Sequence, residues 1–275
     1  MAMQNIVLIH GWASDESIWL ETQNYLEPRY HVYTLDLPIA KNIHSYRDAV
    51  LELIEQNALE QAILVGWSMG ALVAIQVAHQ LPHKVQGLVL VSGTSRFLAD
   101  SPSGIPELGS EDTAKIKNSE QESVTFREAY VGGIPAALIA RMKKRLSKNF
   151  EQTITDFYQL MFSTQEQGEG LVGEVISRDL SRGRTWDLIE AQAGLDFLAE
   201  ADVRAILKGI ACPTLLLHGE QDEICPLRGA EFIQRQIPCA QLIIYPRVGH
   251  IPFLTEFDGF NRALEGWLAR YDDDK

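Results

Sequence analysis

The chain has 275 residues, of which 46% are hydrophobic and 22% are charged, and its formal net charge at pH 7 is −13. This composition is typical of a folded globular protein with a sizeable core, and it excludes a largely disordered chain. The negative charge argues against nucleic acid or an anionic membrane surface as a partner, because both would repel the protein.

The cysteines indicate neither a disulfide framework nor a metal site. They are odd in number, lie far apart and form no C-x-x-C pair: Cys212, Cys225 and Cys239. Such usage is typical of a reducing compartment. No stretch resembles a signal peptide or reaches membrane-spanning length, so we expect a cytoplasmic protein without metal or cofactor.

Short β-branched runs alternate with stretches of helical periodicity over residues 1–94. The predicted strands are Asn5–His10, His31–Asp36, Ala62–Trp67 and Val85–Val91. The predicted helices are Glu16–Leu26, Tyr46–Gln56, which Ser45 is expected to cap, and Met69–His79. The central strands are apolar throughout, which is typical of a parallel sheet covered by helices on both faces.

The middle of the chain has a different pattern. Between about Ser95 and Gly209 the strand signal disappears and the sequence is helical and polar. The earlier pattern then returns, with strands at Thr214–His218 and Leu242–Tyr245 and helices at Leu227–Gln236 and Glu256–Tyr271. We therefore predict an α/β fold whose mostly parallel sheet is flanked by helices. Residues 1–94 and 210–275 would form this core, and residues 95–209 a helical lid insertion.

The sharpest chemical signal is Gly66-Trp67-Ser68-Met69-Gly70, a G-x-S-x-G motif between a predicted strand and a predicted helix. The glycines remove Cβ atoms where strand and helix crowd together, and the tight turn leaves the serine hydroxyl exposed. This context favours a nucleophile over the alternative, an N-capping serine in an ordinary turn.

A serine nucleophile needs a base, and the base needs an orienting carboxylate. His250 follows the last predicted strand, whereas structural or solvated positions account better for the other histidines. Asp222 follows the penultimate strand and is the expected acid, with Glu220 and Glu223 as rivals. The chain order Ser68, Asp222, His250 is that of the α/β-hydrolase fold rather than of chymotrypsin or subtilisin.

Ester cleavage places negative charge on the carbonyl oxygen, which requires hydrogen-bond donors fixed in advance. We expect one donor to be the backbone N–H of Met69, which follows the serine. The second would be the backbone N–H of Trp12, in the loop after the first strand. A purely packing role for the Trp12 side chain would not exclude this backbone role.

Several motifs together resemble the α/β-hydrolase family over essentially the whole chain. They are His10-Gly11-Trp12, Asp36-Leu37-Pro38, Gly66–Gly70, Gly219–Asp222 and Gly249-His250. Within this family the chain looks most like the pimeloyl-[acyl-carrier protein] methyl ester carboxylesterases of biotin synthesis, because it also has Trp19, Leu35–Pro38 and His250–Phe253. The resemblance implies a serine esterase that acts on an acyl chain borne by acyl carrier protein.

Aromatic residues are the candidates for binding the substrate. The residues expected at the ester end of a pocket are Trp12, Trp67, Met69 and Phe253. The candidates on the lid side, which core packing would explain equally well, are Phe126, Tyr130, Phe157 and Met161.

The segment Ala136–Phe150 is predicted to be one amphipathic helix. Its apolar face contains Leu138, Met142, Leu146 and Phe150. The cationic stripe expected on the other side contains Arg141, Lys144, Arg145 and Lys148. A charged stripe is either a solvated face or a docking surface for an acidic partner. The resemblance implies the second, because acyl carrier protein is acidic and docks on the helical lid in that family.

These features predict hydrolysis of methyl pimeloyl-[acyl carrier protein] to pimeloyl-[acyl carrier protein] and methanol, by a monomer. One alternative is a general hydrolase of small esters, lactones or carbon–carbon bonds with the same triad. The other is a ligand receptor on the same fold with weak catalysis.

Overall fold

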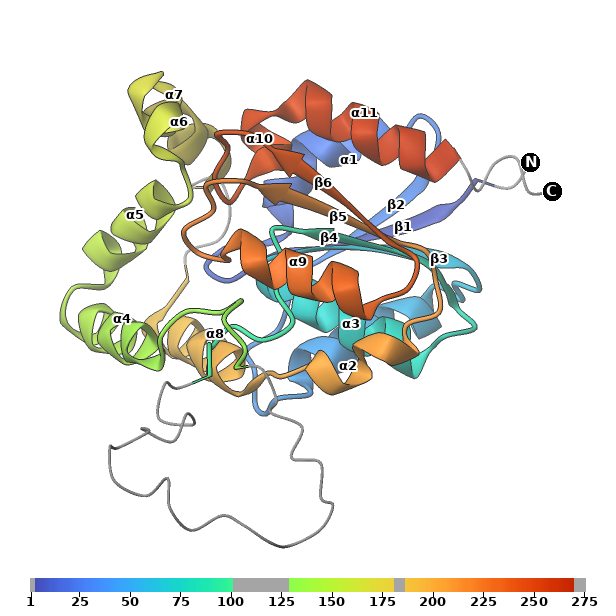
Figure 1. The fold of residues 1–275 in the computed structure, drawn as a ribbon, viewed down its shortest axis with the longest axis horizontal. Helices are drawn as coiled ribbons and strands as arrows, with labels where there is room; N and C mark the ends of the chain where they lie inside the picture. The colour runs from blue at the N-terminus through green and yellow to red at the C-terminus, as the bar shows by residue number, and fades with distance from the viewer. Residues whose placement is uncertain (1–2, 101–128, 181–185, 270–275) are drawn as a thin grey trace, which may run out of the picture.

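The computed structural model describes residues 3–100, 129–180 and 186–269. Its centre is a sheet in which the described strands are all parallel, in the order β2-β1-β3-β4-β5-β6 (Figure 1). The strands are β1 (Asn5–Ile9), β2 (His31–Leu35), β3 (Ala62–Trp67), β4 (Val85–Val91), β5 (Thr214–Gly219) and β6 (Ala240–Tyr245). Strands β3 and β5 are buried at every position, as expected for interior strands covered on both faces.

Helices cover both faces of this sheet. Figure 1 shows α1 (Leu20–Leu26) and α11 (Phe257–Leu268) over one face, and α2 (Ser45–Gln56), α3 (Met69–Gln80) and α9 (Leu227–Gln236) over the other. Two further short helices precede α1 and α11 in the chain. They are the 3-10 helix η1 (Glu16–Trp19) and α10 (Pro252–Thr255). In the described ranges, no helix is long and apolar enough to cross a membrane.

A group of helices follows β4 and precedes β5 in the sequence. In space it lies beside the carboxyl ends of the strands (Figure 1). The α-helices of this insertion are α4 (Ala136–Lys148), α5 (Phe150–Leu160), α6 (Thr164–Gly168), α7 (Leu171–Val175) and α8 (Leu188–Glu200). A π-helical turn, η3 (Ile176–Leu180), and a 3-10 helix, η4 (Arg204–Gly209), follow α7 and α8. The helical character agrees with the sequence, while the domain boundaries at 94/95 and 209/210 stay a prediction.

Two local expectations were wrong. Ser45 does not cap α2 but is its first residue, and its hydroxyl oxygen accepts the backbone N–H groups of Lys41 and Asn42 in the preceding turn. The helix predicted over Ala136–Phe150 ends at Lys148, because Asn149 adopts a φ of −152° and caps α5 through its side chain. Asparagine competes in this way with helical backbone hydrogen bonds.

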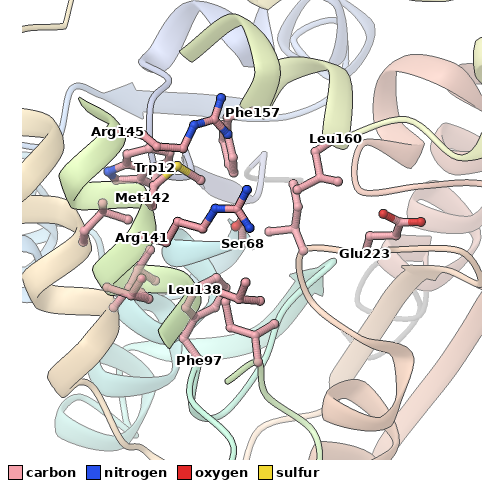
Figure 2. Close-up of a pocket in the computed structure, with 15 residues that line it drawn as sticks. Trp12, Ser68, Phe97, Leu138, Arg141, Met142, Arg145, Phe157, Leu160 and Glu223 are labelled. Atoms are coloured by element: carbon pink, nitrogen blue, oxygen red, sulfur yellow. The ribbon is translucent and has the colours of Figure 1, made fainter. Parts of the chain in front are cut away.

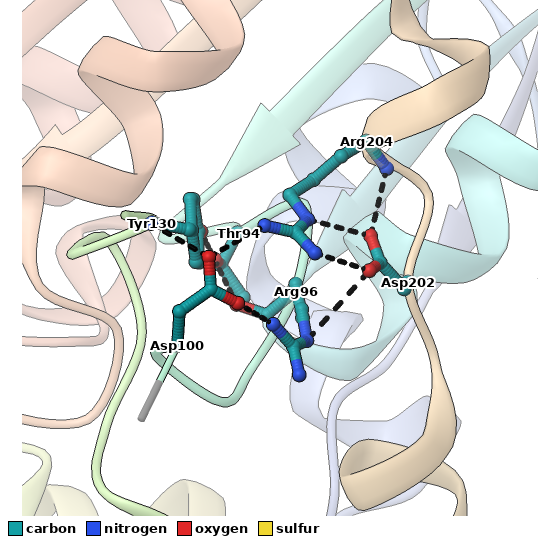
Figure 3. Close-up of polar contacts among 6 residues, drawn as sticks. All are labelled: Thr94, Arg96, Asp100, Tyr130, Asp202 and Arg204. Atoms are coloured by element: carbon teal, nitrogen blue, oxygen red, sulfur yellow. Dashed lines mark hydrogen bonds and ion pairs between the residues drawn. The ribbon is translucent and has the colours of Figure 1, made fainter. Parts of the chain in front are cut away.

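Both ends of the insertion are joined by a polar network, here called the clasp (Figure 3). The clasp consists of Thr94, Arg96, Asp100, Tyr130, Asp202 and Arg204. Arg96 pairs with both Asp100 and Asp202, and Arg204 pairs with the same two carboxylates. The hydroxyl groups of Tyr130 and Thr94 lie 2.7 Å apart. The clasp therefore ties residues that precede α4 to residues that follow α8.

Candidate active site

Ser68 stands on a strained turn between β3 and α3. Its φ of 56° and ψ of −115° are rare for a residue with a side chain, and such strain costs about 1–3 kcal/mol. A Cβ on Gly66 would lie 2.3 Å from the carbonyl oxygen of Gly70, and one on Gly70 would lie 2.4 Å from that of Ile9. Both glycines of the motif are therefore steric requirements of this turn.

His250 and Asp222 form a buried pair at the same edge of the sheet. His250 lies in the loop after β6, and its Nδ1 is 2.7 Å from Oδ2 of Asp222 in the loop after β5. Both side chains are fully buried. Oδ1 of Asp222 accepts the backbone N–H groups of Ile224 and Cys225 at 2.9 and 2.8 Å. The carboxylate is thus held on one side by its own loop and faces the imidazole on the other.

The surroundings of Asp222 keep its carboxyl ionised. Burial raises the pKa of this group, but His250, His218 and the N–H of Cys225 outweigh burial, so the pKa lies below its ordinary value. An ionised carboxylate at Nδ1 fixes the imidazole tautomer that carries its proton there. His250 Nε2 has no hydrogen-bond partner within the described part of the chain and is free to accept a proton.

Burial keeps two further groups close to this pair uncharged, the imidazole of His218 and the thiol of Cys225. Burial lowers the pKa of His218, although Asp222 opposes this, so His218 is neutral and its Nε2–H donates to the Cys225 carbonyl at 2.8 Å. Burial and the Asp222 carboxylate raise the pKa of the Cys225 thiol well above its usual value, despite a hydrogen bond with Ser68. The thiol therefore stays protonated and cannot compete with Ser68 as a nucleophile.

The rival acids take other positions. Glu220 accepts the backbone N–H of Arg247 at 3.2 Å. Glu223 lines the cavity described below. Of the three acids considered from the sequence, the structure brings only Asp222 into hydrogen-bond contact with His250 among the residues it describes.

The loop after β1 lies directly against the serine turn. A Cβ on Gly11 would be 3.0 Å from the Cβ of Ser68, so this close approach requires glycine. Trp12, the next residue, donates its indole N–H to the Ala191 carbonyl at 2.9 Å. Met69 is the first residue of α3, and first-turn N–H groups have no acceptor within their helix. The backbone N–H groups of Trp12 and Met69 stay the predicted oxyanion donors.

A largely apolar cavity of about 310 Å³ opens above Ser68. In Figure 2 the labelled side chains of α4 and α5 surround the serine. The cavity is lined by Trp12, Ser68, Phe97, Ile134, Leu138, Ile139, Arg141, Met142, Arg145, Phe157, Leu160, Leu195, Leu198, Glu223 and Ile224. Such a pocket suits an apolar acyl chain, and the charged groups are those of Arg141, Arg145 and Glu223.

Several expected lining residues are elsewhere. Trp12 and Phe157 line the cavity, but Trp67, Met69, Tyr130, Met161 and Phe253 are buried outside its lining. Trp67 is the last residue of β3, and its indole N–H donates to the His250 carbonyl at 2.9 Å while its ring packs on Phe253. Tyr130 belongs to the clasp. Phe126 lies outside the described residues.

The sequence did not identify some residues of the cavity wall. They are Phe97, Ile134, Leu160, Leu195, Leu198 and Ile224. An apolar residue that faces a cavity has the same linear pattern as one that packs in a core, so periodicity carries no signal for them. Ile224 is the exception, because its place two residues after Asp222 would have allowed the prediction.

The cations of α4 were expected to form a face opposite the apolar side chains, and they do not. Arg141 and Arg145 line the cavity together with Leu138 and Met142, because spacings of three and four residues share one side of a helix. Lys144 and Lys148 are exposed. Arg145 is also ion-paired with Asp156 on α5. The cationic stripe is therefore split between the cavity and the solvent.

Comparison with known proteins identifies the family. The sequence profile described as the alpha/beta hydrolase fold matches residues 4–257. Over 260 residues, the chain is 30% identical to the pimeloyl-[acyl-carrier protein] methyl ester esterase of Nitrosomonas europaea, a match that covers 91% of this chain and 90% of that protein. This chain belongs to the α/β-hydrolase family and is a carboxylic ester hydrolase. An esterase of the same name from Chromobacterium violaceum is 29% identical, over 94% of this hydrolase and 92% of its own length.

Solved structures show the same fold at lower identity. An esterase from Exiguobacterium antarcticum is 21% identical with a TM-score of 0.79, over 98% of this hydrolase and 92% of that chain. A bromoperoxidase from Bacillus anthracis is 18% identical with a TM-score of 0.82 and the same coverage. At these identities the likeness establishes the α/β-hydrolase fold and gives no information about the substrate.

Proposed function

We propose that this hydrolase cleaves methyl pimeloyl-[acyl carrier protein] to pimeloyl-[acyl carrier protein] and methanol, as a step of biotin biosynthesis. The observation that carries the chemistry is the buried His250–Asp222 pair at the same sheet edge as Ser68, which stands on a strained turn under an apolar cavity. The names of the relatives from Nitrosomonas europaea and Chromobacterium violaceum support the substrate.

In this proposal Ser68 attacks the methyl ester carbonyl while His250 Nε2 takes the hydroxyl proton. Asp222 stabilises the imidazolium that forms, and the backbone N–H groups of Trp12 and Met69 bind the oxyanion. The imidazolium then protonates the departing methoxide, which leaves as methanol. Water repeats the sequence on the acyl-enzyme and releases the free carboxylate and Ser68.

The substrate contains both a methyl ester and a thioester, so positioning has to choose the carbonyl that meets Ser68. An acyl chain in the apolar cavity, with its carrier held outside, would present the carbonyl farther from the carrier. The carrier would dock on the cations of α4, namely Arg141, Lys144, Arg145 and Lys148. Such a surface complements an acidic protein, although the whole hydrolase carries a net charge of −13.

The proposal is tested by methanol release from methyl pimeloyl-[acyl carrier protein] and from free monomethyl pimelate. We expect the wild-type hydrolase to prefer the carrier-linked ester and Ser68→Ala to be inactive on both substrates. Ser17→Ala, a control on η1 outside the cavity lining, should match the wild type. Substantial activity of Ser68→Ala would overturn the nucleophile. Equal use of both esters would instead favour a general small-ester hydrolase.

A further inference from the structure

The loop that carries His250 is held by a segment of the insertion. The backbone N–H of His250 donates to the carbonyl of Met161, which directly follows α5, at 2.7 Å. Two residues later, the hydroxyl of Ser163 donates to the carbonyl of Arg247 at 2.6 Å. The predicted base therefore depends on the insertion for its backbone position as well as on Asp222 for its ring.

The two segments are in backbone-to-backbone contact. A Cβ on Gly249 would lie 2.3 Å from the carbonyl oxygen of Met161 and 2.8 Å from the nitrogen of Ser163. No side chain fits between them. A small displacement of the insertion segment must therefore move the residue next to His250.

Glu166 provides the charged contact between these segments. Its Oε2 accepts the N–H of Ser163 at 2.7 Å and the N–H of Gly249 at 2.9 Å, and the residue is 5% exposed. A buried carboxylate is costly unless it is hydrogen-bonded. The bond to Ser163 belongs to the capping box of α6, but capping does not explain the bond to Gly249.

A second capping box in the same chain shows what capping alone involves. At the start of α8, Asp187 and Glu190 exchange the same pair of hydrogen bonds, and Glu190 is 8% exposed. The two glutamates share helix position and burial, but Glu166 also accepts the N–H of Gly249, the residue before His250. Glu190 is thus a matched reference for the capping role of Glu166.

The same segment also meets whatever fills the cavity. Phe157 and Leu160 of α5 line the cavity, and Met161 is the next residue along the chain. An acyl chain that packs against α5 would therefore bear on the peptide that receives the N–H of His250.

We propose that Glu166 is a positioning residue for catalysis. Through Gly249 it fixes the backbone beside His250, and with it the position of the Nε2 that is to take the Ser68 proton, and it couples the insertion to the base. This inference rests on the proposed function, because it takes His250 as the base. Glu166 itself does not touch the substrate.

The test compares Glu166→Met, which removes the acceptor, with Glu190→Met and with Glu166→Gln. The amide oxygen of glutamine can accept both N–H groups, and its NH₂ would replace Oε1, which has no hydrogen-bond partner in the described residues. We measure kcat and KM for p-nitrophenyl acetate, together with the thermal midpoint of each variant. We expect kcat of Glu166→Met to fall roughly ten- to a hundredfold with KM changed less than about threefold.

Glu166→Gln should recover kcat to within about threefold, and Glu190→Met should lower the thermal midpoint similarly while leaving kcat unchanged. Should Glu166→Met not fold, Glu166→Asp keeps the charge but withdraws the acceptor from Gly249, and its kcat must fall in the same direction. Wild-type kcat in the folded acceptor-deficient variant overturns the positioning role. If kcat is unchanged in that Glu166 variant while Ser68→Ala is inactive in the same assay, the positioning role fails and the proposed function stands. An active Ser68→Ala overturns the proposed function itself.

Discussion

At the scale of single residues, the two oxygens of Asp222 have separate tasks. Oδ1 accepts two backbone N–H groups from its own loop, and Oδ2 faces Nδ1 of His250. The two N–H groups of the loop require an acceptor at the place of Oδ1. If an amide replaced the carboxylate, its oxygen would therefore take that place and its NH₂ group the place of Oδ2.

This orientation gives a prediction for Asp222→Asn. The amide oxygen would take the place of Oδ1, so the NH₂ group would face Nδ1 of His250 and force the imidazole to accept there. The ring proton would then move to Nε2, which could no longer act as a base. We expect kcat for p-nitrophenyl acetate to fall about 10³- to 10⁴-fold with an unchanged circular dichroism spectrum. Glu220→Gln, a rival acid, should keep wild-type activity; the reverse ranking would show that Glu220 is the orienting acid.

At the scale of elements, α4 carries cations on two neighbouring sides. Arg141 and Arg145 reach the cavity, whereas Lys144 and Lys148 face solvent. Arg145 is engaged by Asp156, so its reversal would also break an ion pair between α4 and α5. Arg141 lines the cavity, so its reversal would also act on the acyl chain. The informative substitutions are therefore those of Lys144 and Lys148.

We predict that the double change of Lys144 and Lys148 to Glu raises KM for the carrier-linked ester at least about tenfold, because like charges would then face the acidic carrier. Free monomethyl pimelate should be hydrolysed within about threefold of the wild-type rate, since it has no carrier. A matched control reverses two exposed cations elsewhere, Arg228 and Arg235, with the same change in net charge. Equal losses in both double variants would contradict docking on α4.

Elements whose residues decide their own structure could be predicted from the sequence. The apolar run Val85–Val91 and the periodic stretch Leu227–Gln236 have the bounds that were expected, because strand and helix periodicity are local properties. The placement of Ser68, Asp222 and His250 at one edge of the sheet was also readable, since parallel strands bring their carboxyl ends to one edge. The break at Asn149 and the position of Arg141 in the cavity wall could not be predicted from the sequence, because the packing of neighbouring helices determines them.

At the scale of the whole molecule, the clasp joins the segment before α4 to the segment after α8, so it should contribute to the stability of the protein. The Tyr130 N–H, Arg96 and Arg204 hold the pKa of Asp100 below its ordinary value of 3.8. Burial raises the pKa of Asp202, but Arg204 outweighs it and the pKa is lowered. A carboxyl whose pKa is lowered by folding stabilises the protein above its unfolded pKa, and this contribution is lost as pH falls through the folded value.

Arg204→Met should therefore lower the free energy of unfolding by about 1 kcal/mol at pH 7. The difference from the wild type should shrink as the pH is lowered from 4 towards 2, where both carboxyls become protonated in either protein. Urea unfolding at each pH measures it, with Arg47→Met, which removes an exposed pair with Asp48, as the reference. A difference that stays constant over this range would show that the guanidinium acts through packing alone.

The place of the insertion in the chain, between two strands that pair with each other, also affects how the protein folds. Strand β5 pairs with β4, yet the whole insertion separates Val91 from Thr214, the end of one strand from the start of the next. Because the entropy of closing a loop grows only with the logarithm of its length, this separation costs little stability. It does delay nucleation, since non-local pairing slows folding. During synthesis, β1 to β4 leave the ribosome first and expose the buried edge of β4 until β5 arrives, which makes that edge the place where a nascent chain is most open to aggregation.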